Sequence, residues 1–207
     1  MLICTPDAAI EAVAAAIEPG PAAVLHCSGA TGLDALRTHD RRGSVHPLMA
    51  LPDAVTGAER LRTGGWFAVA GDPVAHTIVD LLGGRWFEVA DDDRALYHAT
   101  AAIGANHLVA LLGQVERLAQ RCGVPVEAFL DLAAGSFADV RRQGAGAALT
   151  GPASRGDHVT LARHRAALPA EEIALYDALA DAATALAAER DNVHGSHVGT
   201  GDDVEQE

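Results

Sequence analysis

A histidine and an asparagine stand at helical spacing in a segment of small and apolar residues, Leu96 to Leu111. His98, Ala102 and Asn106 recur at every fourth position, which places them along one face of a helix. A histidine titrates near neutral pH and can give or take a proton, and an asparagine amide can hold a polar group in place. The pattern therefore predicts a helix that lines a cleft with an acid–base group, His98, and an orienting amide, Asn106. A histidine at a domain seam and a buried amide that bridges two helices remain alternatives.

Polar side chains also follow two predicted strands where those strands end. Ser28 and Gly29 follow the strand at 22–27, and His46 follows a short strand near 44–45. Ligands of α/β sheets bind at the carboxyl ends of the strands, so we expect Ser28 and His46 to contact a substrate. In the alternative, Gly29 supplies a bend and Ser28 caps the next helix. Two histidines above one sheet edge could suggest a metal. No third ligand stands at a suitable spacing, so no metal site is predicted.

A hydrolase is a weaker interpretation of the same residues. Ser28 with His98 or His46 could form a nucleophile and its base. The sequence contains no Gly-x-Ser-x-Gly elbow, and no acidic partner for the histidine stands out.

An arginine stands in a loop that precedes a predicted helix, in the run Thr150-Gly151-Pro152 to Arg155-Gly156-Asp157. The loop amides and Arg155 could hold an anion such as a carboxylate. Equally, Asp157 could cap the helix and Arg155 could form a surface ion pair.

The chain begins with a short apolar strand and a strong helix start. Thr5 can cap the helix, Pro6 suits its first position, and Asp7 favours the positive end of the helix dipole. Strands are predicted at 2–4, 22–27, 44–45, 66–70 and 85–89, with helices at about 6–17, 33–38 and 73–82 between them and a loop or broken helix at 49–63. This order predicts an α/β domain with a mostly parallel sheet over residues 1–90.

From Asp91 onward the apolar period becomes helical. Helices are predicted through about residue 122 and at about 126–134 and 137–143, then up to 168 and from 169 to 190. The fold class is therefore α/β plus all-α, with a partial Rossmann-like sheet at 1–90 and a helical bundle at 91–190. The polar, acidic and Gly-rich run 191–207 is predicted to be disordered.

A Gly-x-Gly-x-x-Gly turn, which binds a dinucleotide diphosphate, is absent from the sequence. We expect that the first βαβαβ half of a doubly wound fold is missing and that the strand at Leu2 is an unpaired edge.

Five motifs appear in an order that is specific in combination: His26-Cys27-Ser28-Gly29, Ser44-Val45-His46-Pro47-Leu48, Leu96-Tyr97-His98-Ala99, Asn106, and Leu149-Thr150-Gly151-Pro152-x-x-Arg155-Gly156-Asp157. In these motifs the chain resembles the bacterial Rossmann-like proteins that carry domain of unknown function 2520. That family is similar to the 6-phosphogluconate dehydrogenase-like oxidoreductases, which have a helical C-terminal domain that often dimerises.

The resemblance implies an NADP or NAD cofactor and a small-molecule substrate. His98 stands where related hydroxyacid dehydrogenases and ketopantoate reductases have a lysine, so it would be the proton donor to a carbonyl. Asn106 would orient the substrate, while Ala102 replaces a second asparagine. The cofactor would lie near Thr5, Pro6 and Asp7, together with Ser28 and Gly29.

Composition narrows the class of partner. The net charge of −13 argues against non-specific binding to nucleic acid or to an anionic membrane. The 3 cysteines have no CxxC spacing, which fits a reducing cytoplasm. No apolar run is expected to reach membrane-spanning length, and no signal peptide is predicted. We expect a cytoplasmic homodimer that joins through its helical domain.

Together these observations predict reduction of a small carbonyl or imine substrate with NAD(P)H. The alternative is a non-catalytic remnant that works as a binding or dimerisation subunit.

Overall fold

A computed structural model describes residues 1–195, with side chains to residue 192. The chain divides into two compact units, Met1–Ala110 and Leu111–Glu207, and each is described by itself. The first unit includes the helix that carries His98 and Asn106, whereas the sequence predicted a boundary near residue 90.

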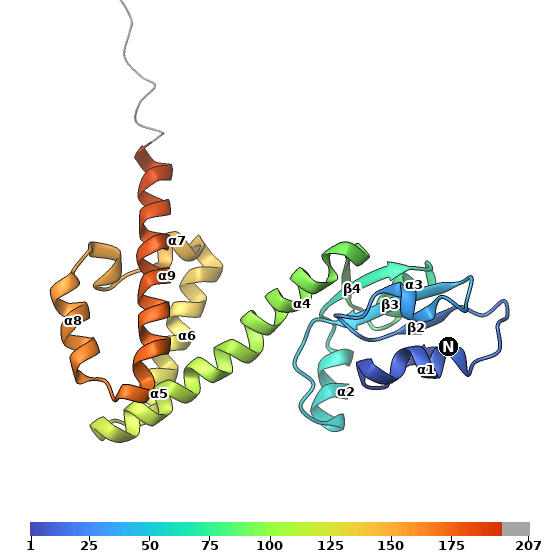
Figure 1. The fold of residues 1–207 in the computed structure, drawn as a ribbon, viewed down its shortest axis with the longest axis horizontal. Helices are drawn as coiled ribbons and strands as arrows, with labels where there is room; N and C mark the ends of the chain where they lie inside the picture. Colours follow the sequence, from blue (N-terminus) through green and yellow to red (C-terminus); the bar gives the residue numbers. More distant parts are fainter. Residues whose placement is uncertain (196–207) are drawn as a thin grey trace, which may run out of the picture. The chain divides into compact units, whose positions relative to one another are not determined.

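The first unit is built on a 5-stranded sheet whose strands lie side by side in sequence order (Figure 1). They are β1 (Leu2–Ile3), β2 (Val24–His26), β3 (Arg42–Pro47), β4 (Trp66–Gly71) and β5 (Arg85–Glu88). All neighbouring pairs are parallel except β3 and β4, which are antiparallel. The expected α/β fold with a mostly parallel sheet is confirmed.

Helices cover both faces of this sheet because its central strands are apolar on both sides. On one face Ile3 and Val24 pack with α1 (Ile10–Ala15). On the other face Leu25 and Phe67 pack with α3 (Val74–Leu81). Side chains alternate between the two faces along each strand. Leu2 and Leu25 therefore point toward the α3 face, and so do the residues two positions after them, Cys4 and Cys27.

Three local expectations were wrong. The segment 49–63 contains a regular helix, α2 (Ala54–Arg62), which begins because the Asp53 carboxylate accepts the amide hydrogens of Val55 and Thr56. The predicted helix at 33–38 is a 3-10 helix, Leu33–Leu36. Thr5 caps nothing: Pro6 is the N-cap of the 3-10 helix Asp7–Ala9, with no side-chain cap.

The predicted long helix is continuous but contains a wider turn. It consists of α4 (Arg94–Ala102), a π-helical turn at Ile103–His107, and α5 (Leu108–Cys122). By length and composition alone the segment Asp91–Cys122 could cross a membrane, so the expectation that no run reaches spanning length was wrong. One such helix is weak support for a membrane protein.

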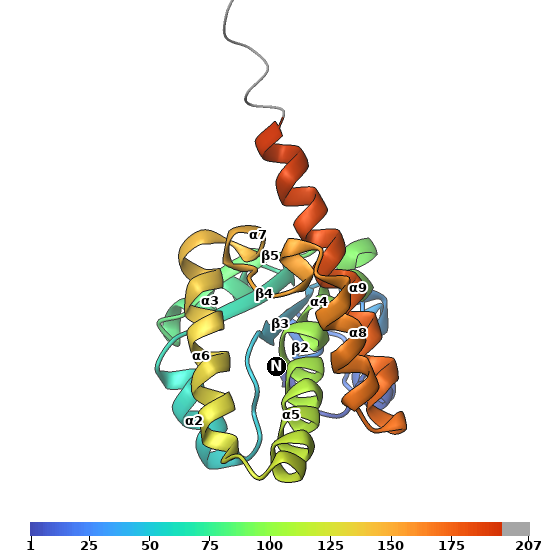
Figure 2. The same ribbon diagram turned by 90° about the vertical axis from the view of Figure 1, so that its left-hand side faces the viewer.

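The second unit is helical throughout its described part. Its helices after α5 are α6 (Val126–Gln143), α7 (Ala145–Ala148), α8 (His158–Ala167) and α9 (Ala170–Gly195). Figure 2 shows α6 as one unbroken helix, which corrects the prediction of two helices separated near residue 135.

Buried polar contacts join α5 to α9. The Gln114 amide donates to the Glu172 carbonyl over 2.8 Å, and Arg117 binds the nearly buried Glu172 carboxylate through two nitrogens. The α9 helix extends over 191–195, so the first five residues of the predicted disordered tail are helical. Residues 196–207 lie outside the described part of the chain.

Candidate functional site

A buried arginine at the start of α4 joins this helix to β3 and to the turn that follows β2. The Arg94 side chain is 3% exposed, and its Nε donates to the Asp91 carboxylate over 2.8 Å. Its other nitrogens donate to the Ser28 carbonyl, over 3.4 Å, and to the Ser44 hydroxyl. Since Ser28 follows β2 and Ser44 belongs to β3, this guanidinium fixes α4 against the carboxyl edge of the sheet.

One turn along α4, a tyrosine and a histidine form a polar pair. The Tyr97 hydroxyl lies 2.6 Å from Nδ1 of His46, at the end of β3. Burial raises the pKa of Tyr97 to about 12, so the phenol keeps its proton. Burial, with the nearby His98 and Arg94, lowers the pKa of His46, so its imidazole is neutral at neutral pH. We assign the hydrogen bond as Tyr97 O–H to Nδ1, which leaves the proton of the ring on Nε2.

His46 and His98 lie over a glycine that has no room for a side chain. The two imidazoles have centroids 6.1 Å apart. A Cβ built on Gly29 would stand 2.8 Å from Cε1 of His46 and 2.9 Å from Cδ2 of His98. The backbone at Gly29 therefore approaches both rings, which explains why a glycine stands there.

A substitution tests this close approach. We expect Gly29→Ala to displace both imidazoles and to cost about 1–3 kcal/mol of stability through overpacking. The NMR resonances of the His46 and His98 rings should shift. Gly20→Ala is the matched control, because a Cβ at Gly20 meets nothing within 4 Å. Unchanged imidazole resonances in Gly29→Ala would show that the rings are not in contact with Gly29.

One buried polar atom at this edge of the sheet, Oγ1 of Thr5 after β1, has no hydrogen-bond partner among the described residues. Nε2 of His26, at the end of β2, has only a long contact with the Gly32 backbone. The His26 ring is fully buried, and its Nδ1 accepts the amide hydrogen of Ser28 over 3.2 Å. Burial, with the charge of Arg94, lowers the pKa of His26 to about 4. Because unpartnered buried polar groups are rare in native proteins, the Thr5 hydroxyl points to a ligand at this edge.

The lowered pKa of His26 predicts a pH dependence of stability. An unfolded histidine titrates near 6.5. Between that value and about 4 the unfolded chain binds a proton that the folded chain does not, so stability falls as the pH falls through this window. From pH 7 to pH 5 the loss should be about 2 kcal/mol.

The measurement is urea unfolding at both pH values, with His26→Asn as the comparison. An asparagine can still accept the Ser28 amide hydrogen but does not titrate. The loss of stability from pH 7 to pH 5 should be smaller by about 2 kcal/mol in the variant. An equal loss in both proteins would contradict the lowered pKa of His26.

The hydroxyl of Ser28 is occupied as an acceptor. It accepts the amide hydrogens of Ala30, over 3.2 Å, and of Thr31, over 2.9 Å. Ser28 thus holds the turn that follows β2, and it does not cap the 3-10 helix at Leu33, whose N-cap is Gly32. Its own O–H hydrogen is still free to donate to a ligand.

His98, on α4, and Asn106, in the π-helical turn that follows α4, are both exposed. Eight residues of an ideal α-helix rotate about 80° beyond two full turns. The π-helical turn at Ile103–His107 takes more residues per turn, so it returns Asn106 toward the face that carries His98. The sequence predicted the shared face but not the turn that improves it.

Arg155 lies in the second unit, where it is exposed at the end of the 3-10 helix Ala153–Arg155. The Asp157 carboxylate accepts the Thr160 amide hydrogen over 3.0 Å and so caps α8. This agrees with one of the two sequence interpretations of the loop. The anion-binding role of Arg155 stays a prediction.

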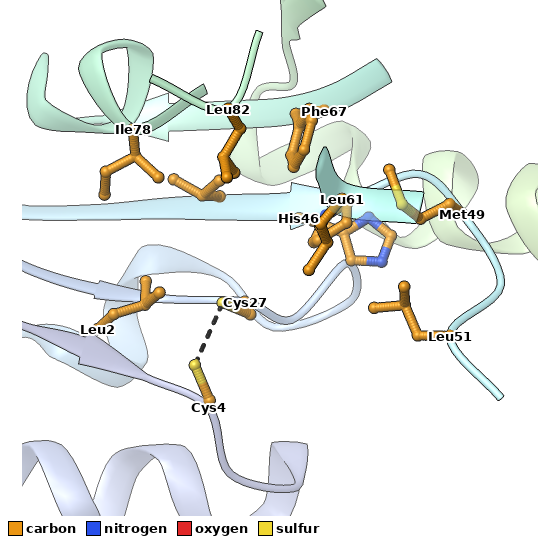
Figure 3. Close-up of a pocket in the computed structure, with 12 residues that line it drawn as sticks. Leu2, Cys4, Cys27, His46, Met49, Leu51, Leu61, Phe67, Ile78 and Leu82 are labelled. Atoms are coloured by element: carbon orange, nitrogen blue, oxygen red, sulfur yellow. Dashed lines mark hydrogen bonds between the residues drawn. The ribbon is translucent and has the colours of Figure 1, made fainter. Parts of the chain in front are cut away.

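A largely apolar pocket of about 410 Å³ opens beside His46 on the α3 face of the sheet. Figure 3 shows Ile78 of α3 and Leu82, which caps that helix, on one side of it and Cys4 and Cys27 on the other. The volume lies in the range of small-molecule sites, about 300–1,000 Å³.

Three residues of this site were missed from the sequence: Arg94, Tyr97 and His26. Arg94 follows three aspartates, and such a run of charged residues is typical of an exposed surface. His26 stands in an apolar segment that is typical of a strand. Tyr97 precedes His98 directly, and that adjacency was the one available signal. Among the described residues no group of three or more metal-ligating side chains gathers.

Comparisons with known proteins agree with this fold. Residues 67–183 match the model of the family described as Domain of unknown function (DUF2520). Among solved structures, the chain is similar to protein TM1727 from Thermotoga maritima, with 24% identity and a TM-score of 0.75 over 91% of this chain and 78% of that one. It is also similar to the "putative NADP oxidoreductase BF3122 from Bacteroides fragilis", with 17% identity and a TM-score of 0.68 over 88% of this chain and 74% of that one.

No curated protein matches the chain. At these identities the two solved structures show the fold alone, and they confirm the Rossmann-like architecture expected from the sequence.

Proposed function

The chain belongs to the DUF2520 family, and we propose that it is a reductase of a small carbonyl or imine substrate that uses NADP or NAD. The observation that carries the proposal is the gathering of His46, Tyr97 and His98 at the carboxyl edge of a parallel sheet, beside a pocket for a small molecule. Ligands of open α/β sheets bind at this edge. A solved structure of similar fold bears the name of an NADP oxidoreductase, which agrees with the proposal.

The residues at this edge fit the nicotinamide-ribose end of a dinucleotide. The buried Oγ1 of Thr5 has no partner among the described residues, and a ribose hydroxyl or a carboxamide could bond to it. Pro6, Asp7 and Gly29 would lie beside the same group. A Gly-rich turn for the diphosphate is absent from the sequence, so these residues account for one end of the cofactor only.

When bound, the reduced nicotinamide supplies a hydride to the carbon of the carbonyl or imine. The exposed His98 imidazole gives its proton to the oxygen or nitrogen of that group as negative charge develops there. His46, held by Tyr97, keeps a neutral N–H donor next to His98 and orients the substrate. The O–H of Ser28 and the Asn106 amide are the remaining orienting groups.

The test is consumption of NADPH and of NADH in the presence of small 2-oxo acids, aldehydes and cyclic imines. The proposal predicts consumption that depends on the substrate for at least one class. A lack of consumption with every class, at substrate concentrations that saturate related reductases, would contradict it. We further propose a cytoplasmic location, because the 3 cysteines of the sequence are an odd number without CxxC spacing, which fits a reducing compartment.

A second candidate function is dimerisation through the helical unit. The α6 helix has no fully buried residue, and one of its faces exposes Phe137 at 58% together with Leu130 and Val140, each at 42%. An apolar helix face left in water is costly, and a second copy of the chain would cover it.

We therefore expect Phe137→Glu to convert a dimer to a monomer, as measured by light scattering after gel filtration. Leu81→Glu is the matched control, because Leu81 is also apolar and 83% exposed but lies on α3 of the other unit. Wild-type protein that is monomeric at micromolar concentration would contradict this function.

A further inference from the structure

Two cysteine thiols face each other at the ends of β1 and β2. The Sγ atoms of Cys4 and Cys27 are 3.8 Å apart, which Figure 3 marks with a dashed line. We propose that these two thiols form a reversible internal disulfide when a low-molecular-weight disulfide, such as glutathione disulfide, acts as the oxidant. The formation of this disulfide does not depend on the proposed reduction of a carbonyl, although both cysteines line the pocket beside His46.

The register of the sheet places the two thiols opposite each other. Leu2 pairs with Leu25 and Ile3 pairs with His26, so Cys4 and Cys27 follow at the next position of both strands. Residues paired in parallel strands point to the same face, and the strands lie about 4.7–4.9 Å apart. Disulfides bridge Cα atoms about 4.4–6.8 Å apart, so the pair can close without a large backbone movement.

Exposure decides the order of the steps. Cys4 is exposed, whereas Cys27 is partly buried, so an oxidant in solution reaches Cys4 first. The Cys4 thiolate attacks one sulfur of glutathione disulfide, which forms a mixed disulfide and releases one glutathione thiolate. The Cys27 thiolate then attacks the Cys4 sulfur and releases the second glutathione. Two protein thiols are oxidised and one glutathione disulfide is reduced, and the two protons of the protein thiols end, through solvent, on the two glutathione thiolates that leave.

Burial and the neighbouring Cys4 raise the pKa of Cys27 to about 12. Little thiolate is therefore present at Cys27 near neutral pH, and its attack on the mixed disulfide is the slower step. Well below that pKa the rate of ring closure should rise about tenfold per pH unit, because the thiolate fraction rises by that factor.

The site also touches the pocket. Both cysteines line the cavity that His46 borders, so the disulfide draws together two points of the same wall. Access of a ligand to the pocket thereby becomes dependent on the redox state of the pair.

The experiment is intact-mass analysis of the full chain after incubation with glutathione disulfide. The Cys122→Ser variant is used so that the exposed cysteine on α5 does not react. We expect a product that is lighter by two hydrogen atoms, has no free thiol, and returns to the starting mass with dithiothreitol. Peptide mapping should join Cys4 to Cys27.

Single substitutions separate the steps. Cys27→Ser, in the same background, should stop at a stable mixed disulfide on Cys4, and Cys4→Ser should react more slowly than Cys27→Ser. The proposal is overturned if the Cys122→Ser chain accumulates one or two glutathione adducts without the internal disulfide, including at pH 9. It is also overturned if the chain remains fully reduced.

Discussion

Arg94→Met lowers the free energy of unfolding by about 2–4 kcal/mol, because two buried acceptors lose their donor. Methionine keeps most of the length and apolar contact of the arginine stem, so the loss isolates the guanidinium. The Ser44 hydroxyl is fully buried, and the Ser28 carbonyl lies at a buried turn, so water does not readily replace the lost hydrogen bonds. Asp91 is 40% exposed and can be solvated, so it adds little to the cost.

The same substitution has an electrostatic consequence at the site. The charge of Arg94 contributes to the lowered pKa of both His26 and His46. Its removal should raise both pKa values, which an NMR titration of the imidazole resonances measures. Arg37→Met is the matched control, because Arg37 forms an exposed ion pair with Glu11. That pair should contribute less than about 1 kcal/mol. Equal losses in Arg94→Met and Arg37→Met would show that Arg94 does not join α4 to the sheet.

His98→Gln should reduce the turnover of the accepted substrate by about 10²–10⁴-fold, which is the usual contribution of a positioned general acid. Glutamine keeps the polarity and a hydrogen-bond donor but cannot transfer a proton at neutral pH. The side chain is exposed and makes no hydrogen bond to another described residue, so stability and cofactor affinity should remain near those of the wild type.

The control for this variant lies on the same helical segment. His107→Gln replaces another exposed histidine, in the π-helical turn, and should leave turnover within about twofold of the wild type. The pH dependence of turnover, measured by steady-state kinetics across pH 5–9, should also change. The decrease in turnover that marks loss of the proton from the acid should be absent in the His98→Gln variant. If both variants retain wild-type turnover, the proton donor is another group, and His46 becomes the next residue to substitute.

Local patterns predicted the parts of this site that are close in sequence. The helix at 73–82, the apolar strand segments and the shared face of His98 and Asn106 all depend on neighbours within about one or two turns. Contacts across the fold were not predictable in this way. Arg94 binds Ser44 and Ser28 at separations of 50 and 66 residues, and a single sequence does not reveal which acceptors a buried arginine finds.

Two misjudged segments have specific causes. The segment 49–63 was predicted as a loop or broken helix, whereas it contains α2, in which Gly57 gives Leu51 room to pack, with a Cβ position 3.5 Å from Cδ2 of Leu51. The π-helical turn depends on one additional residue within a continuous helix, which leaves no signature in the apolar period. Thr5 was given a capping role, whereas its hydroxyl is buried without a partner among the described residues.

The most direct test of the proposed function is titration calorimetry of the chain with NADPH, compared with Thr5→Val and Thr100→Val. We predict saturable binding at one site per chain and an affinity about tenfold weaker in Thr5→Val, which is the contribution of one buried hydrogen bond. Thr100→Val should bind as the wild type does, because the Thr100 hydroxyl donates to the Leu96 carbonyl on an exposed helix. An absence of binding, or equal affinity in all three proteins, would contradict a cofactor site at this edge of the sheet.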